Sequence, residues 1–231
     1  MSTEPDRHQA PAPQSQAETP PGPERLLALS DGVVAIALTL LVLDLKVPAT
    51  TLLRHSDSAS DLATVLRGDT DQLISYVVSF YVTAQFWLAH HRVFRVVTGH
   101  SEGLAWWNFA FLFTITLIPF TSGLLGLFAE NPLAVSIFAA NMLLASLATQ
   151  GTSRFVQRKH LISGGYNTEH ERAGRIRSWT VALIMVASIA VAWVNTDLAK
   201  YLWILIAFLP DIVIRATRKP SRPADQVTGT A

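Results

Sequence analysis

A hydroxyl and an acid stand next to each other near the start of an apolar segment, where Ser30 and Asp31 follow Arg25 by about one and a half helical turns. The twelve residues after Asp31 contain no charged side chain. A carboxylate placed inside a membrane costs on the order of a few kcal/mol unless a partner satisfies it. We therefore expect Asp31 to need a polar partner from elsewhere in the chain.

Candidate partners end a second apolar segment, Trp87-Leu-Ala-His90-His91-Arg92. If this segment runs antiparallel to the first, its histidines lie near the level of Asp31. We expect an Asp31–histidine contact, and the sequence does not decide between His90 and His91. Interfacial residues that cap a helix end are an alternative. A metal site is disfavoured, because adjacent histidines on a helix point about 100° apart.

The elements that position these residues are six apolar segments, 26–45, 72–91, 104–127, 133–150, 179–195 and 198–214. Roughly 20 apolar residues span the hydrocarbon core of a bilayer. The segments contain four formal charges, Asp31, Asp44, Lys200 and Asp211, and 104–127 shows no polar helical face. The sequence predicts an all-α integral membrane protein with six transmembrane helices per subunit.

The connections between these segments differ in basic residues. If the N-terminus is cytoplasmic, fourteen of the 18 Lys and Arg lie on the cytoplasmic side, and only Lys46, Arg54, Arg67 and Lys200 lie outside. This asymmetry is typical of membrane proteins and predicts that both termini are cytoplasmic. Residues 1–23 hold six of the twelve prolines and predict a disordered tail. We expect a membrane domain over 24–215 and a second flexible tail over 216–231.

The composition excludes several classes of function. The chain has no Cys, which rules out disulfides and thiolate metal sites. A formal net charge of +1 gives no basic surplus for a phosphate backbone, so we expect no nucleic-acid partner. No His-Glu-x-x-His, Gly-x-Ser-x-Gly or paired acidic motif occurs, and we therefore do not expect an enzyme.

The first segment also carries an apolar stripe. At about 100° per residue, Leu40 and Leu43 fall within about 40° of Ile36, and Thr39 lies about 60° away. Ser30 and Asp31 point about 120–140° from Ile36. The stripe could therefore line an axis shared with other subunits, while the polar pair packs against neighbouring helices. Packing or lipid contact is the simpler interpretation of the stripe on spacing alone.

Three motifs resemble those of the transmembrane protein 175 family of potassium channels. Arg25-x-x-x-Leu29-Ser30-Asp31-Gly32 resembles the first-helix signature, with Leu29 where Phe is usual. Trp87-x-x-His90-His91-Arg92-x-Phe94 and Ile118-Pro119-Phe120 resemble the second-helix and third-helix motifs.

The resemblance implies a potassium-permeable cation channel in the cell membrane. It also implies a homotetramer with four first helices around a central pore, permeant potassium and no cofactor. Carried over by position, the pore constriction falls on Ile36, Leu40 and Leu43, and the selectivity hydroxyl on Thr39. A structural network is implied for Arg25, Ser30 and Asp31 with Trp87, His90 and His91. Nothing resembles a Thr-Val-Gly-Tyr-Gly filter.

Two other functions remain open from the residues alone. A proton-coupled or other secondary transporter also needs an intramembrane acid with nearby histidines. Pro119 and Pro210 interrupt the third and sixth segments in corresponding places, which is a pointer to a broken-helix repeat. A scaffolding membrane protein is the second alternative.

Overall fold

The computed structural model describes residues 22–45, 70–99, 101–162 and 168–217. Its helices are α1 (Pro23–Leu41), η1 (Val42–Asp44), α3 (Thr70–Phe94), α4 (Glu102–Thr116), α5 (Ile118–Leu127), α6 (Pro132–Arg158), α7 (Thr168–Ala192), α8 (Thr196–Tyr201), η3 (Leu202–Ile204) and α9 (Leu205–Thr217). Most of both predicted tails, and most of the connection between the first two predicted segments, lies outside these residues. Pro23 already belongs to α1, and 216–217 belong to α9.

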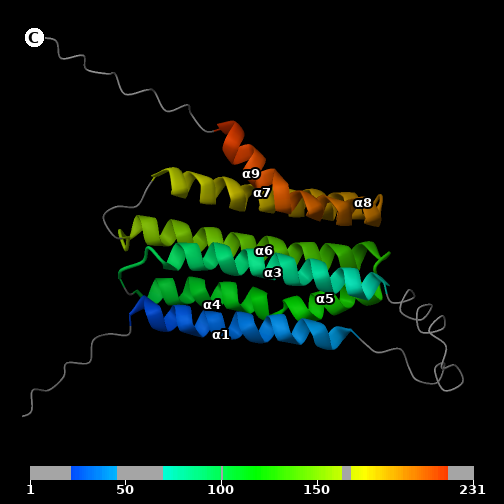
Figure 1. Cartoon of the computed structure of the whole chain (residues 1–231), viewed down its shortest axis with the longest axis horizontal. Coiled ribbons are helices and arrows are strands. Elements are labelled where there is room, and N and C mark those ends of the chain that lie inside the picture. Colours follow the sequence, from blue (N-terminus) through cyan, green and yellow to red (C-terminus); the bar gives the residue numbers. More distant parts are fainter. Residues whose placement is uncertain (1–21, 46–69, 100, 163–167, 218–231) are drawn as a thin grey trace, which may run out of the picture.

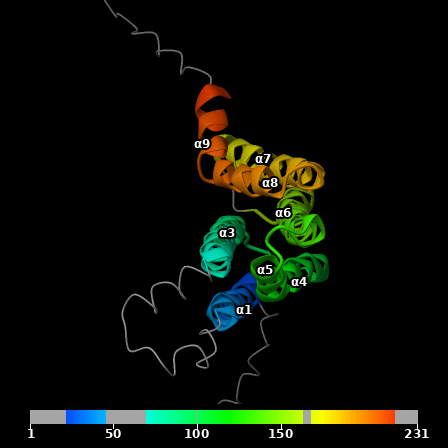
Figure 2. The same ribbon diagram turned by 90° about the vertical axis from the view of Figure 1, so that its right-hand side faces the viewer.

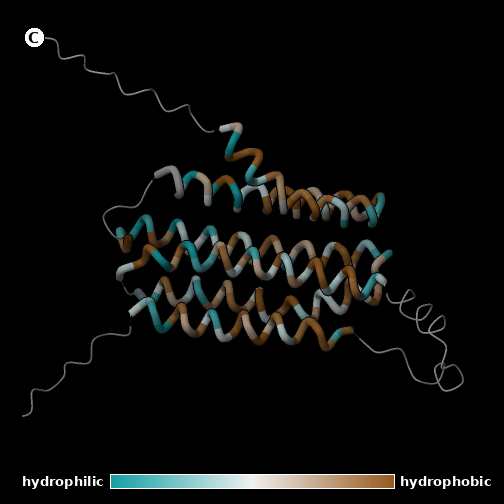
Figure 3. Tube along the Cα trace, viewed as in Figure 1, coloured by the Kyte–Doolittle hydropathy of each residue, from teal (hydrophilic) through white to brown (hydrophobic). Residues whose placement is uncertain are grey.

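The long helices lie side by side and alternate in direction (Figure 1). Each of the six predicted apolar segments coincides with one helix or with consecutive helices, so the all-helical prediction is confirmed. Within the described residues, four helical stretches are long and apolar enough to cross a membrane: Pro23–Asp44, Glu102–Leu127, Pro132–Arg158 and Arg172–Ala192. Hydrophobic residues run along the helices, and hydrophilic residues gather toward their ends (Figure 3).

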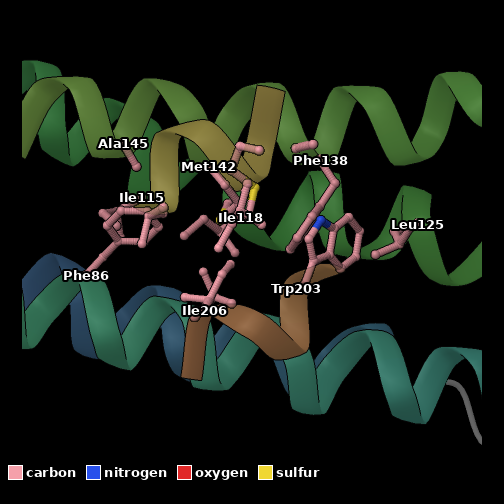
Figure 4. Close-up of a cluster of buried hydrophobic side chains, with 14 of the residues drawn as sticks. Phe86, Ile115, Ile118, Leu125, Phe138, Met142, Ala145, Trp203 and Ile206 are labelled. Atoms are coloured by element: carbon pink, nitrogen blue, oxygen red, sulfur yellow. The ribbon is translucent and has the colours of Figure 1, made fainter. Parts of the chain in front are cut away.

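Viewed end on, α6 lies between two groups of helices (Figure 2). The group of α1, α3, α4 and α5 lies on one side of it, and α7, α8 and α9 lie on the other. Phe138, Met142 and Ala145 of α6 are all fully buried. They pack with Ile115 and Ile118 in one hydrophobic cluster, which also reaches Trp203 (Figure 4). This shared core joins the two groups of helices.

The two prolines singled out in the sequence behave differently. The third segment is interrupted at Leu117, and α5 begins just before Pro119, which has no backbone N–H to donate. Across this break the Asn141 amide of α6 donates to the Thr114 carbonyl oxygen at 3.1 Å. The expected interruption at Pro210 is wrong, because α9 continues through it. Proline is tolerated inside membrane helices when nearby groups satisfy the freed backbone. The sixth segment is instead broken at the 3₁₀ turn η3.

Candidate functional site

The first helix has two faces with different surroundings. Ser30, Val34, Ala37 and Leu41 are buried, at the spacing that places residues on one side of a helix. This side packs against α3, α4 and α5. Helix α1 therefore lies at the edge of the bundle and commits only one face to the subunit.

The predicted stripe occupies the opposite face. Ile36 is 60% exposed, Leu40 43% and Leu43 71% within the single subunit. Thr39 is exposed beside them, and its hydroxyl donates to the Ile36 carbonyl oxygen at 2.8 Å. The separation of the stripe from the buried face is thus as the spacing predicted. Its role as a constriction and the role of Thr39 in selectivity stay predictions.

Ser30 meets a polar partner that the sequence reasoning missed. The Ser30 hydroxyl lies 2.9 Å from Asn108 Oδ1 of α4 and 2.8 Å from the Leu26 carbonyl oxygen. The same Asn108 oxygen lies 2.7 Å from His90 Nε2 of α3. All three polar residues are at most 1% exposed. Asn108 therefore joins α1, α3 and α4 at one buried point.

The His90 ring is held on both faces by aromatic rings. Phe94 and Phe111 each stack on it with a centroid distance of 4.4 Å. Stacking of this kind adds to the packing energy of buried aromatic groups. The position of His90 is therefore fixed by two ring contacts and by Asn108.

Among the described residues, the hydrogen bond of the Asp31 carboxylate is made with Trp87 rather than with one of the two histidines expected to contact it. Asp31 Oδ1 accepts instead from the Trp87 indole N–H at 2.8 Å. Trp87 lies almost one turn before His90 and His91 on α3, so its indole reaches the level of Asp31 while His90 turns toward Asn108. His91 packs on Trp87, with ring centroids 5.4 Å apart. Five of the six predicted network residues are thus gathered, but through other contacts.

Arg25 is the predicted network residue that the structure does not place with the others. Its side chain is exposed, and the described residues give it no ion pair or hydrogen bond. On the helix it falls on the same side as Ile36. No group of three His, Asp or Glu able to hold a metal occurs in the part of the chain that the structure describes.

Asn108 had a detectable signal in the sequence. It is the only Asn, Gln or charged residue between Leu104 and Leu127. An amide in such a run costs free energy unless it is hydrogen-bonded, so it indicates an interior partner. What the sequence could not supply was the identity of that partner.

Basic residues gather at one end of the bundle. The end where α1 begins also contains the end of α3, the start of α4, the end of α6 and the start of α7 (Figure 1). The basic residues in these stretches are Arg25, Arg92, Arg95, Arg154, Arg158, Lys159, Arg172, Arg175 and Arg177. At the same end the Arg154 guanidinium lies over the Trp179 ring, with the Arg154 Cζ atom 5.4 Å from the ring centroid. Apolar helices with this charge distribution define a multi-pass membrane protein.

Comparison with known proteins gives the family. The family model described as "Endosomal/lysosomal potassium channel TMEM175" matches residues 25–119. A potassium channel of Streptomyces collinus is 30% identical over 179 residues, which is 75% of this chain and 84% of the relative. A potassium channel of a Chryseobacterium strain is 28% identical over 202 residues, 84% of this chain and 97% of the relative. The chain belongs to the TMEM175 family of ion channels.

Two further relatives extend the comparison. The crystal structure of a lysosomal potassium-selective channel TMEM175 homolog from Chamaesiphon minutus has the same fold, with a TM-score of 0.68 and 22% identity over 83% of this chain and 97% of that one. The human protein named "Endosomal/lysosomal proton channel TMEM175" is 30% identical over 115 residues. That match covers 50% of this chain but 22% of the human protein.

Proposed function

We propose that the chain is one subunit of a homotetrameric, potassium-permeable channel in which four α1 helices line a central pore. The observation that carries this proposal is the exposed face of α1. Ile36 and Leu40 of α1 form an exposed apolar stripe with Leu43 of the following turn η1, and the opposite face of α1 is buried. Two bacterial relatives named as potassium channels match most of this chain.

The stripe has the chemistry of a hydrophobic constriction. Rings of Ile36, Leu40 and Leu43 across a narrow pore would exclude water, and a dehydrated ion meets a high barrier there. Conduction then requires the rings to widen or rehydrate. A ring of Thr39 hydroxyls offers oxygen to a partly dehydrated ion. Potassium gives up its water more easily than sodium, so this ring favours potassium modestly.

The polar contacts on the other face are proposed to hold α1 in place. Ser30 and Asp31 are joined to α3 and α4 through Asn108 and Trp87. Removal of Asp31 leaves the Trp87 indole N–H without an acceptor, which costs about 1–3 kcal/mol, whereas Ser30 without Asn108 keeps the Leu26 carbonyl oxygen. The contacts therefore fix the rotation of α1 and with it the direction of the stripe.

The proposed subunit crosses the cell membrane six times. The basic end of the bundle supports a cytoplasmic location for that end, because Lys and Arg are enriched in cytoplasmic connections. Both termini are then cytoplasmic, and the membrane domain extends over 24–215 between two tails. Potassium is the permeant ion, the lipid bilayer is the surrounding medium, and no cofactor takes part.

Ion flux from liposomes tests the constriction. We expect Ile36→Asn to raise potassium efflux by about tenfold or more and to reduce the preference for potassium over sodium, because an amide lowers the barrier to hydration of the ring. Ile212→Asn is the matched control, since Ile212 is 58% exposed on α9. It should leave the flux unchanged. Equal effects of the two substitutions, or normal flux with Ile36→Asn, would reject the pore assignment.

The same liposomes separate the channel from its alternatives. A channel passes potassium down any potassium gradient, whereas a coupled transporter requires a second ion and saturates. Proton flux should be measured in the same vesicles, because the human relative is named a proton channel. The mass of the solubilised oligomer checks the tetramer. A monomeric or dimeric mass, or potassium movement that depends on an imposed proton gradient, would overturn the proposal.

A further inference from the structure

A second polar site lies away from α1. A cavity of about 360 Å³ is enclosed by α3, α6, α7 and α9. This volume falls within the range of about 300–1,000 Å³ that is usual for ligand pockets. Its wall includes Tyr81 and Leu88 of α3, which are 39% and 42% exposed, so the cavity opens at the surface of the subunit.

The cavity has apolar residues at one end and a charged pair at the other, and its wall also includes the polar residues Gln85, Ser146, Thr149 and Ser178. Val82 and Phe86 of α3, Val181 of α7 and Ile206 of α9 are buried in its wall. Arg177 of α7 and Asp211 of α9 lie closer to the basic end of the bundle than these apolar residues do. The wall runs along α3 from Tyr81 to Ala89, about 12 Å at the helical rise. Such a space suits a molecule with a charged head and an apolar body.

The charged end has a positive surplus. Arg177 forms an ion pair with Asp211, and their side chains are 30% and 54% exposed. Arg92 is close enough for the charges of Arg177 and Asp211 to act on it. Arg92 lies outside the cavity lining, nearly one turn beyond Ala89 on α3, so two guanidinium groups and one carboxylate lie at or near this end. Arg177 uses one of its nitrogens on Asp211, and a guanidinium has five N–H donors, so it can bind a second acceptor at the same time.

We propose that this cavity binds one anionic phospholipid of the leaflet at the basic end of the bundle. The lipid phosphate contacts Arg177, with Arg92 nearby, and the glycerol and the first part of an acyl chain lie along Val82, Phe86 and Ile206. Asp211 holds Arg177 at the rim. Basic pockets between membrane helices on the cytoplasmic side are suited to anionic headgroups.

Charge decides between a lipid and a second copy of the chain. Asp211, the one acid in the lining, is already paired with Arg177, so the charged end suits a small anionic group better than the basic end of a second copy. An anionic lipid neutralises the surplus and fills the apolar end as well. Free phosphate would satisfy Arg177 but would leave the apolar wall of the cavity unfilled.

Native mass spectrometry of the full-length protein tests the proposal. The purified protein is mixed with phosphatidylglycerol or with phosphatidylcholine of identical acyl chains. We expect phosphatidylglycerol to be retained about tenfold better, and Arg177→Gln to remove that preference, because a charge-assisted contact to phosphate is lost. Arg158→Gln, at an exposed arginine of the same end outside the cavity, should change nothing. Equal retention of both lipids by the wild-type protein would overturn the proposal without bearing on ion conduction.

Two further arms locate the lipid. Ala89→Trp places a large ring in the cavity wall while every charge stays, and it should abolish retention of phosphatidylglycerol. Continued retention by this variant would show that headgroups bind the basic surface rather than the cavity. Glycerol 3-phosphate serves as the soluble probe. If it competes with phosphatidylglycerol at equal concentration, the acyl contacts carry no affinity and the assignment to a lipid is wrong.

Discussion

The two faces of α1 are built by different chemistry. The inward face holds Ser30, buried and bonded to Asn108, with Asp31 bonded to Trp87 at its edge. The outward face is a stripe of exposed Ile and Leu with one hydroxyl. The inward hydrogen bonds form within one subunit, although the buried Asn108 Nδ2 and His90 Nδ1 have no partner among the described residues, whereas the outward stripe has no partner helix in the subunit. We therefore expect substitutions on the inward face to change the stability of the subunit, and substitutions on the outward face to change ion conduction by the assembly.

The largest loss of stability is expected from Asn108→Leu. It removes the oxygen shared by Ser30 and His90. His90 Nε2 is left without a partner, which costs about 1–3 kcal/mol, and Ser30 keeps the Leu26 carbonyl oxygen but loses a hydrogen bond worth about 0.5–1.5 kcal/mol. We expect unfolding to be easier by about 2–4 kcal/mol, seen as a lower melting temperature and less recovered oligomer. Thr116→Val, at an exposed hydroxyl of α4, is the control and should stay within about 0.5 kcal/mol. Similar melting temperatures for both variants would contradict the role of Asn108.

Asp31→Ala comes next. It leaves the Trp87 indole N–H without an acceptor and should cost about 1–3 kcal/mol of stability, measured by thermal unfolding of the purified protein. Asp31→Asn keeps an oxygen at that position and should recover most of the loss. If the amide variant is as unstable as the alanine variant, the negative charge rather than the bond to Trp87 holds Asp31 in place.

Thr39→Val probes the outward face. We expect stability within about 0.5 kcal/mol of the wild type, because the side chain is exposed in the subunit. The preference for potassium over sodium should fall about fivefold, the equivalent of about 1 kcal/mol from one lost oxygen contact. Flux ratios in liposomes measure it, with Thr116→Val as the matched loss of a hydroxyl. An unchanged ratio would remove Thr39 from the pore.

The smallest effect is expected from Arg25→Gln. The Arg25 side chain is exposed and makes no ion pair or hydrogen bond with the described residues, so the melting temperature of the subunit should not change. A loss as large as that of Asp31→Ala would show that Arg25 makes a stabilising contact that forms only between subunits.

The sequence predicted the helices and the two faces of α1 because both depend on local periodicity. Apolar segments of membrane length indicate helices. A rotation of about 100° per residue places Ser30 and Ile36 on different sides of a helix, and this does not depend on the neighbouring helices. The apolar run of 133–150 marks only part of α6, which continues to Arg158. Hydropathy identifies the part suited to lipid and says nothing of where the helix ends.

The sequence could not predict which side chains meet. Trp87, His90 and His91 lie within about one helical turn, so a shift of about 5 Å between two helices exchanges one partner for another. That offset is set by packing at many points, including Phe94 and Phe111 around His90. Asp31 therefore bonds to Trp87, and His90 bonds to the Asn108 amide. Residue spacing alone predicts neither pair.

If Thr39 faces the proposed pore, the bond from its hydroxyl to the carbonyl of Ile36 has a consequence for the sign of the permeant ion. With its hydrogen already given to the backbone, Thr39 turns only lone pairs outward. Four such oxygens around an axis would offer electron density and no proton. Anions would find nothing to bind there, so discrimination between cation and anion would require no formal charge on the wall.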